Sequence, residues 1–425
     1  MFAVRGAARA WLLLCACSAC GDEEPSAPYP IGMIDGGMMD AALPPVDASM
    51  DASSPPDAGD AGGPSCSTGS LDIATVTETF LNPLEPLALS LRNEGASLGW
   101  VALENGKGRA FTRWFGSSGD TLDTPQVADL AKQSEPAIAA TGSGFVSLSS
   151  DDVAGRLQLR ARSTDTTGVL IDVEPKQLTN DAEDNRAPVL ATGADGNVVA
   201  LWTARSPSTR AKTMLLDQAG NALGVAHDIP EVGALLGRAA LSPMGAGYLL
   251  AWVDAAGRRV HVQRLDKAGL PVGASSQVDA EGGARGNLDL AFTDQGGALV
   301  FDVLVDGARP EVRVRTFDLS GVATSSEQNL TRYPDTGMRP SLVALRGGYV
   351  LAYRSAQAPE QQLRLALLDG RGAPITAAKV TTLTSLDLPL VMRASPDGEE
   401  VFLSWLDQLP ESNGYQLQRT WIHCD

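Results

Sequence analysis

Residues 189–229 read VLATGADGNVVALWTARSPSTRAKTMLLDQAGNALGVAHDI. Four short apolar segments stand in this stretch, and turns that contain glycine, aspartate or proline separate them. Segments of this length between turn residues are typical of β-strands, whereas a helix needs a longer run with a period of about 3.6 residues. The stretch therefore predicts four consecutive antiparallel strands joined by turns.

The same order of strands and turns recurs along the chain. One glycine per unit marks the turn between the first and second strands, at intervals of 49 to 52 residues: Gly95, Gly144, Gly196, Gly247, Gly297, Gly348 and Gly398. A second landmark, Asp-x-x-Gly, marks the turn between the third and fourth strands in the middle five units, and residues 116–119 form a looser first copy. Units of about 50 residues with four strands are typical of β-propeller blades. The sequence therefore predicts an all-β, seven-bladed β-propeller.

The character of the strands agrees with this architecture. The second strand of a unit is apolar on both faces, as in residues 248–252, which suits a strand between two neighbouring sheets. The third strand alternates, as in residues 156–160, which suits a position nearer the solvent. Two alternatives fit less well, because tandem β-sandwiches need repeats of about 100 residues and β-solenoids use much shorter coils.

Residues 1–20 have the pattern of a bacterial export signal. Two arginines precede the apolar run 10–16, which is far shorter than the roughly 20 residues that a membrane-spanning helix needs. The following Ser18-Ala19-Cys20-Gly21 resembles the lipobox of bacterial lipoproteins, and the resemblance implies that Cys20 is acylated, as with palmitate, and becomes the N-terminus. A second possible lipobox ends at Cys17, and simple secretion without lipidation is a further alternative.

Residues 21–65 contain nine acidic residues and no Lys, Arg or His, among many Pro, Ala and Gly. Such a segment cannot bury enough apolar surface to offset chain entropy, so we expect a disordered, extended tether. A calcium-binding acidic strip is the alternative. An acidic tether behind a lipobox resembles surface lipoproteins of the myxobacterial type. The resemblance implies a lipid-anchored cell-envelope protein, facing the periplasm or the cell surface, that meets the membrane through its anchor only.

The propeller is expected to occupy residues 66–425 and to close with a strand from its N-terminal end. The seventh unit ends after its third strand, 415–421, whereas residues 71–79 form an extra strand before the first unit. Placed as the fourth strand of the last blade, residues 71–79 bring Cys66 beside Cys424. An exported protein meets an oxidising compartment, so we predict a Cys66–Cys424 disulfide; two free thiols are the alternative.

Two short motifs bear on the family. Residues 395–398, Ser-Pro-Asp-Gly, resemble the turn of TolB-type propeller repeats, and the repeat architecture is similar to that of kelch and TolB-like propellers. The resemblance implies the fold and carries over no catalytic residue. Residues 95–99, Gly-Ala-Ser-Leu-Gly, match the nucleophile elbow of hydrolases, but an elbow needs a helix after its serine. Strands are expected on both sides here, so we interpret the string as one of the recurring turns.

The remaining chemistry-bearing residues favour packing. The three histidines fall in separate blades without a cluster at metal-ligand spacing: His227, His261 and His423. We therefore assign no catalytic residue, no metal site and no cofactor. Tryptophans recur at or near the ends of second strands, which indicates packing between blades rather than a sugar-binding platform: Trp100, Trp202, Trp252 and Trp405.

The candidate binding residues lie in loops opposite the turns. Since both kinds of turn share one face, the longer, charged loops gather on the other face around the mouth of the channel. Arginines that precede first strands can hold a carboxylate or phosphate through bidentate contacts, and two acids of one loop join them in the candidate set: Asp181, Asp184, Arg186, Arg238 and Arg339. A solvated rim with weak local ion pairs is the alternative.

The net charge is −18, from 33 Lys+Arg and 51 Asp+Glu. Nucleic-acid binding needs a basic footprint, so nucleic acid is excluded as a partner. We predict a binding or protein-interaction module, with a monomeric folded domain, for a glycan, a small anion or an envelope protein. A propeller hydrolase or lyase acting on envelope or extracellular polysaccharide is the alternative, and a purely structural envelope protein is a third class.

Overall fold

The computed structural model describes residues 64–67, 73–80, 87–104, 107–117, 126–127, 133–172, 174–206, 208–230, 232, 239–254, 259–278, 283–306, 309–331, 335–357, 360–386, 388–409 and 414–424. The expected signal segment with Cys17 and Cys20, the tether up to residue 63, and Arg238 lie outside the described residues. Within the described ranges, no helix has the length and apolarity needed to cross a membrane.

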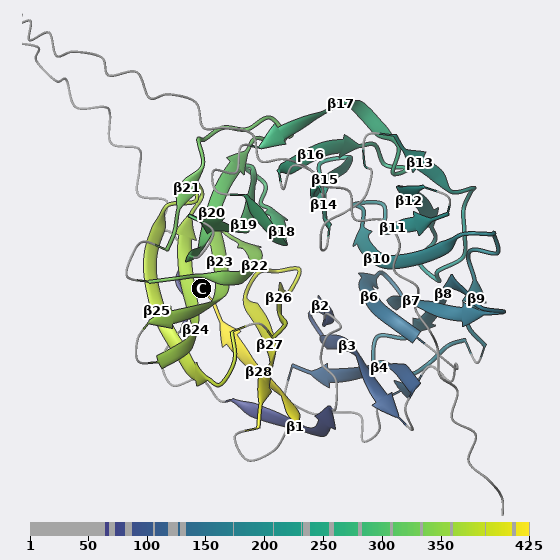
Figure 1. The fold of residues 1–425 in the computed structure, drawn as a ribbon, viewed down its shortest axis with the longest axis horizontal. Coiled ribbons are helices and arrows are strands. Elements are labelled where there is room, and N and C mark those ends of the chain that lie inside the picture. The colour runs from purple at the N-terminus through teal and green to yellow at the C-terminus, as the bar shows by residue number, and fades with distance from the viewer. Residues whose placement is uncertain are drawn as a thin grey trace, which may run out of the picture. The chain divides into compact units, whose positions relative to one another are not determined.

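Seven four-stranded antiparallel sheets stand in a ring around a central channel (Figure 1). The fold is a seven-bladed β-propeller. The strands, blade by blade, are β2 (Ala88–Arg92), β3 (Gly95–Glu104), β4 (Lys107–Gly116) and β5 (Gln126–Val127) in blade 1; β6 (Gln133–Thr141), β7 (Gly144–Val153), β8 (Arg156–Thr164) and β9 (Lys176–Gln177) in blade 2; β10 (Asp184–Thr192), β11 (Val198–Arg205), β12 (Thr209–Leu216) and β13 (His227–Ile229) in blade 3; β14 (Ala240–Met244), β15 (Gly247–Val253), β16 (Val260–Leu265) and β17 (Pro271–Val278) in blade 4; β18 (Ala284–Phe292), β19 (Gly297–Val305), β20 (Arg309–Phe317) and β21 (Gln328–Asn329) in blade 5; β22 (Met338–Leu345), β23 (Gly348–Gln357), β24 (Glu360–Asp369) and β25 (Pro374–Leu383) in blade 6; and β26 (Leu390–Ala394), β27 (Glu400–Gln408), β28 (Tyr415–His423) and β1 (Ala74–Phe80) in blade 7.

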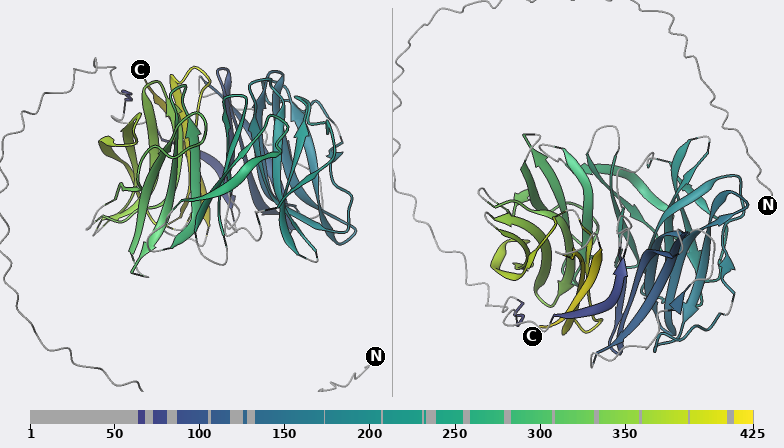
Figure 2. Two further views of the ribbon diagram at one scale, coloured as in Figure 1. Left: turned by 90° about the horizontal axis from the view of Figure 1, so that it is seen from above. Right: turned by 60° about the horizontal axis from the view of Figure 1, so that its bottom comes forward.

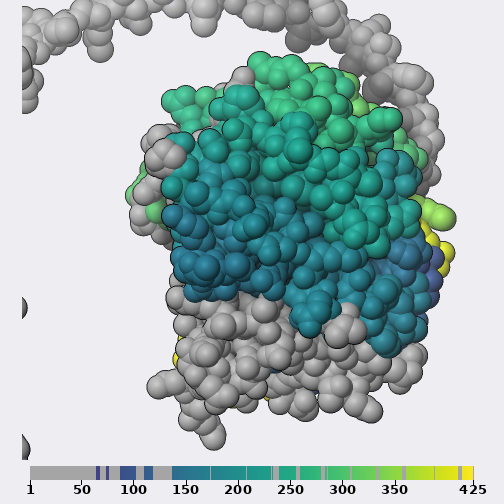
Figure 3. Space-filling model, turned by 90° about the vertical axis from the view of Figure 1, so that its right-hand side faces the viewer, coloured from purple at the N-terminus to yellow at the C-terminus, as the bar shows by residue number. Residues whose placement is uncertain are grey.

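The second strands form the most deeply buried layer because neighbouring sheets cover both of their faces. In β15, every side chain from Tyr248 to Val253 is buried, and the recurring tryptophans of β3, β11, β15 and β27 are buried as well. This confirms that these tryptophans pack between blades. Figure 2 shows the blades edge-on, with strands running between the two faces, and Figure 3 shows blades 2 to 4 packed side by side into a continuous surface.

The Asp-x-x-Gly turns explain why one glycine per blade recurs. In blade 4, the Asp266 carboxylate accepts hydrogen bonds from the N–H groups of Ala268 and Leu270, at 2.8 and 2.9 Å. Gly269 has a φ of +80°, and a Cβ at this position would lie 3.0 Å from Val199 of the preceding blade. Only glycine combines that backbone angle with so close an approach. The repeat therefore records contact between blades as well as turn geometry.

Closure of the ring follows the predicted arrangement. β1 pairs antiparallel with β28 and completes blade 7, with Ala74 opposite Arg419. Cys66 and Cys424 form a disulfide, as predicted. The N–H of Ser67 also donates to the carbonyl of His423, at 2.9 Å. The two ends of the described chain are therefore joined by a covalent bond and by a strand pair.

The Gly-x-Ser-x-Gly string lies in β3, which pairs with strands on both sides. Ser97 is only 5% exposed. The string is therefore part of a buried strand and forms no nucleophile elbow, as its expected neighbours indicated.

Candidate functional site

The first strands of the seven blades enclose a channel with a cavity of about 1240 Å³. We call the mouth at the N-terminal ends of these strands the loop mouth, since the loops between second and third strands surround it. The mouth at their C-terminal ends, beside the glycine and Asp-x-x-Gly turns, is the turn mouth. A hollow of this size at the centre of the fold is large enough to enclose a small ligand.

The channel lining has the opposite charge balance from the chain as a whole. Among the described residues, it contains five arginines and two acids: Arg92, Arg186, Arg205, Arg339, Arg393, Glu94 and Asp289. The complete sequence has 51 Asp+Glu against 33 Lys+Arg. An acidic protein thus encloses a cationic channel, and low-dielectric walls focus such a field on the interior.

Three of these arginines stand at the loop mouth, on blades 3 and 6. Arg186 Nη2 lies 3.8 Å from Asp184 Oδ2, and both side chains are more than a third exposed. The ion pair is therefore weak. Arg205 ends β11 and is exposed, and its side chain has no hydrogen-bond or ion-pair partner among the described residues. Arg339 is the second residue of β22 and also lines the channel.

The first strands of blades 3 and 6 each contain a β-bulge near their start. The pairing register shifts between Arg186 and Val189 in β10, and between Met338 and Ser341 in β22. Each bulge contains a residue with positive φ before a proline, Ala187 at 51° and Arg339 at 52°. An extra residue of this kind bends a strand and redirects its side chains. The bulges therefore help to position the arginines at the loop mouth.

Backbone strain concentrates on this face. All five non-glycine residues with positive φ in the described ranges lie in loops or strand starts around the loop mouth: Ala154, Ala187, Ser206, Asp306 and Arg339. Such conformations cost about 1–3 kcal/mol each and cluster at binding and catalytic sites. The turn face, in contrast, reaches positive φ through glycine.

The two candidate acids hold the loop before β10. Asp181 Oδ1 accepts hydrogen bonds from Asn185 Nδ2 at 3.0 Å and from the N–H of Glu183 at 3.1 Å. Asp184 Oδ1 accepts a hydrogen bond from the N–H of Leu157 in blade 2, at 3.0 Å. Neither acid belongs to the channel lining. The structure thus brings Asp184 to Arg186, and it places Arg186 and Arg339 in the channel lining on blades 3 and 6, on opposite sides of the channel (Figure 1).

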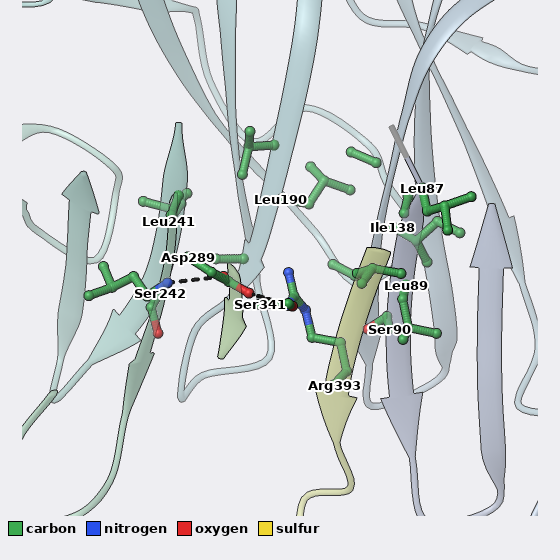
Figure 4. A pocket seen from close by; sticks show the side chains of 18 of the residues that line it. Leu87, Leu89, Ser90, Ile138, Leu190, Leu241, Ser242, Asp289, Ser341 and Arg393 are labelled. Atoms are coloured by element: carbon green, nitrogen blue, oxygen red, sulfur yellow. Dashed lines mark hydrogen bonds and ion pairs between the residues drawn. The ribbon is translucent and has the colours of Figure 1, made fainter. Parts of the chain in front are cut away.

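A second polar group lies deeper in the channel and was not singled out from the sequence. Asp289 of β18 accepts hydrogen bonds from the Ser341 hydroxyl at 2.9 Å and from Arg393 Nη1 at 3.1 Å. The N–H of Leu342 donates to the same carboxylate oxygen at 3.0 Å. We call Asp289, Ser341 and Arg393 the mid-channel cluster (Figure 4). It joins the first strands of blades 5, 6 and 7.

The rest of the wall at this depth is aliphatic. In the strand register, Asp289 takes the place that Ala88, Ala137, Val189 and Ala240 take in blades 1 to 4. The next residue along each of those four strands is a larger aliphatic one, and we call these residues the aliphatic wall: Leu89, Ile138, Leu190 and Leu241. Figure 4 shows the aliphatic wall around the channel, with the mid-channel cluster on one part of the wall. One charged residue among four aliphatic equivalents is the signal by which the sequence could have indicated the cluster.

Elsewhere, one histidine pairs with an acid of its own blade. His261 Nε2 lies 2.9 Å from Asp254 Oδ2, and its ring stacks on Trp252 with centroids 5.3 Å apart. In the portion of the chain that the structure describes, no three His, Cys, Asp or Glu side chains are grouped so that they could hold a metal ion.

Comparison with known proteins indicates the fold and no more. No protein-family model and no curated protein matches the sequence. A polysaccharide lyase structure is similar, with a TM-score of 0.53, 9% identity, and coverage of 80% of this chain and 90% of that one. A fungal alcohol oxidase in complex with copper has a TM-score of 0.52, 11% identity, and coverage of 84% and 77%. An ulvan lyase has a TM-score of 0.50, 8% identity, and coverage of 83% and 95%.

Proposed function

We propose that this protein is an extracytoplasmic binding module whose propeller holds an anionic ligand in its central channel. The observation that carries the proposal is the excess of arginine in the channel lining of a chain that is acidic overall. An arginine guanidinium is always charged and presents a fork of donors that matches a carboxylate, sulfate or phosphate. A small anion, or the acidic group of a glycan, is therefore the ligand class.

The loop mouth is the entrance in this proposal. The side chain of Arg205 is exposed and unpaired among the described residues, and the ion pair of Arg186 with Asp184 is long, at 3.8 Å, and partly exposed. These guanidinium groups can exchange water for a ligand oxygen without breaking a strong internal ion pair. Their combined field also attracts anions from solution, and this attraction weakens as salt is added.

We further propose that Cys20 carries a lipid anchor and that residues 21–65 tether the propeller to the cell envelope. Pro64 lies beside Gly348 in a turn between first and second strands, and Cys66 is bonded to Cys424 at the end of a third strand. The tether thus joins the propeller on the turn face, which leaves the loop mouth on the side away from the attachment point. Palmitate labelling that survives Cys17→Ser and is lost with Cys20→Ser supports the anchor; labelling unaffected by Cys20→Ser refutes the assignment.

The binding proposal is tested by calorimetric titration of the purified full chain with glucuronate, sulfate and phosphate, in the wild type and in Arg205→Gln. Arg371→Gln is the matched control, because Arg371 is an exposed arginine in a turn between third and fourth strands, outside the channel lining. We expect Arg205→Gln to weaken binding and to reduce its salt dependence, and Arg371→Gln to change neither. Equal affinity in all three proteins, or no binding to any anion, would contradict the proposal.

The same proteins distinguish the enzymatic alternative. Release of reducing ends or unsaturated products from an acidic polysaccharide would favour a propeller hydrolase or lyase over a binding module. We expect binding without product.

A further inference from the structure

We infer that the ligand of the channel is an amphipathic carboxylate, whose charged group binds Arg393 while its apolar body lies against the aliphatic wall. This inference rests on the proposed function and specifies its ligand class. It comes from the two kinds of surface that the channel presents at adjacent levels, the mid-channel cluster and the aliphatic wall.

One edge of the Arg393 guanidinium, the one formed by Nε and Nη2, is available to a ligand. Its Nη1 donates to Asp289 Oδ2 at 3.1 Å and to the carbonyl of Met392 at 2.8 Å. The Nε and Nη2 atoms form no hydrogen bond with any residue that the structure describes, and the side chain is 40% exposed in the channel. Nε and Nη2 form the fork that binds both oxygens of a carboxylate at once.

Asp289 positions this arginine and is itself saturated. One oxygen receives the Ser341 hydroxyl, the N–H of Leu342 and Arg393 Nη1, and the other receives the N–H of Leu290 at 3.0 Å. The Ser341 oxygen in turn accepts the N–H of Met392, at 3.0 Å. These bonds tie three blades together around Arg393. The guanidinium is therefore held in place before a ligand arrives, which reduces the entropy lost on binding.

The aliphatic wall favours a ligand that is apolar beyond its charged group. Leu89, Ile138, Leu190 and Leu241 line the channel one residue along their strands from the level of Asp289, and their side chains offer no hydrogen bond. A sugar hydroxyl placed against them would lose its water without gaining a partner, which is unfavourable. A hydrocarbon chain or ring in the same place would be stabilised by burial. The cavity of about 1240 Å³ is large enough for a ligand of this kind.

The test is a homologous series of carboxylates. Acetate, butyrate, hexanoate and octanoate are titrated into the purified full chain in detergent-free buffer, and heats of binding are measured. If the chain of the ligand lies on the aliphatic wall, affinity rises with length by up to about fourfold per buried methylene. If the charged group alone is recognised, all four acids bind with the same affinity.

Three variants locate the two ends of the ligand. Arg393→Gln should weaken every acid of the series by about tenfold or more, since a charge-assisted hydrogen-bonded pair is lost. Leu190→Asn should leave acetate unchanged and flatten the dependence on chain length. Leu319→Ser is the control, because Leu319 is 47% exposed and lies outside the channel lining, and it should change nothing.

The outcomes separate this inference from the proposed function. If glucuronate or sulfate binds in an Arg205-dependent manner but octanoate binds no better than acetate, the inference is wrong and the proposed function stands. If no anion binds, both are wrong. Should Arg393→Gln fail to fold, Arg393→Lys keeps the charge and removes the fork, and unchanged octanoate affinity in that variant overturns the role of Arg393.

Discussion

Removal of the Cys66–Cys424 disulfide is the perturbation whose magnitude follows most directly from the structure. The bond links residues 358 positions apart and therefore constrains almost the whole propeller in the unfolded chain. The chain-entropy relation gives about 6 kcal/mol for a loop of this length, and native disulfides removed from secreted domains cost about 2–5 kcal/mol. We expect Cys66→Ser with Cys424→Ser to lower the free energy of unfolding by about 3–6 kcal/mol.

Urea unfolding followed by tryptophan fluorescence measures this loss, because tryptophans are buried between blades 1, 3, 4 and 7 and should report on the ring. The double variant avoids a single reactive thiol, and reduction of the wild type with dithiothreitol should reproduce its midpoint. The pairing of β1 with β28 remains in both cases. A loss of less than about 1 kcal/mol would mean that this strand pair alone closes the ring, and the entropic reasoning would be refuted.

Two further predictions concern the Asp-x-x-Gly turns. Gly269→Ala should lower the free energy of unfolding by about 2–4 kcal/mol, because the alanine would be strained at positive φ and its Cβ would overlap Val199. Gly273→Ala is the control and should cost only about 1–2 kcal/mol, because Gly273 has a φ of +73° but no atom within 4 Å of the new Cβ. Urea unfolding of both variants measures the difference, and equal losses would contradict the contribution of the contact between blades. The hydroxyl of Ser320 and nearby backbone N–H groups lower the pKa of Asp318. A carboxyl whose pKa is lower in the folded state stabilises the protein above its unfolded pKa of about 3.9, and this contribution is lost as the pH falls through the folded pKa. Asp318→Asn should therefore reduce the loss of stability on acidification from pH 7 to about pH 3, measured by urea midpoints, and an unchanged pH dependence would speak against these bonds.

The fold was predictable because each blade repeats the same local constraints. The turn glycines and Asp-x-x-Gly motifs are required both by backbone angles and by contact with the next blade, as at Gly269, so they return at a constant interval in the sequence. The missing fourth strand of blade 7 and the two cysteines outside the expected signal segment, Cys66 and Cys424, then indicated where the ring closes. Local constraints of this kind can be recognised from the sequence alone, since each involves residues close together in the chain.

The site was predictable only in part. Arg186 and Arg339 were found because they were expected just before first strands; the structure places them inside β10 and β22, near the start of each strand, and both line the channel. The mid-channel cluster was missed because its members are far apart in the sequence: Ser341 lies 52 positions and Arg393 lies 104 positions after Asp289. Sequence alone does not show which side chains of seven inner strands converge on one axis. That convergence depends on the register and rotation of complete blades.

The two faces of the propeller have different roles: the turn face stabilises the fold, and the loop face carries the proposed binding residues. The turn face repeats glycine turns with carboxylate hydrogen bonds, and it receives the disulfide and the start of the described chain. The loop face differs from blade to blade, and all the non-glycine residues with positive φ in the described ranges gather there, together with Arg186, Arg205 and Arg339. Strain is tolerated only where surrounding structure holds it in place. The regular turn face and the closed ring provide that support, so substitutions on the turn face should act on unfolding, whereas substitutions of the loop-mouth arginines should act on anion affinity at unchanged stability.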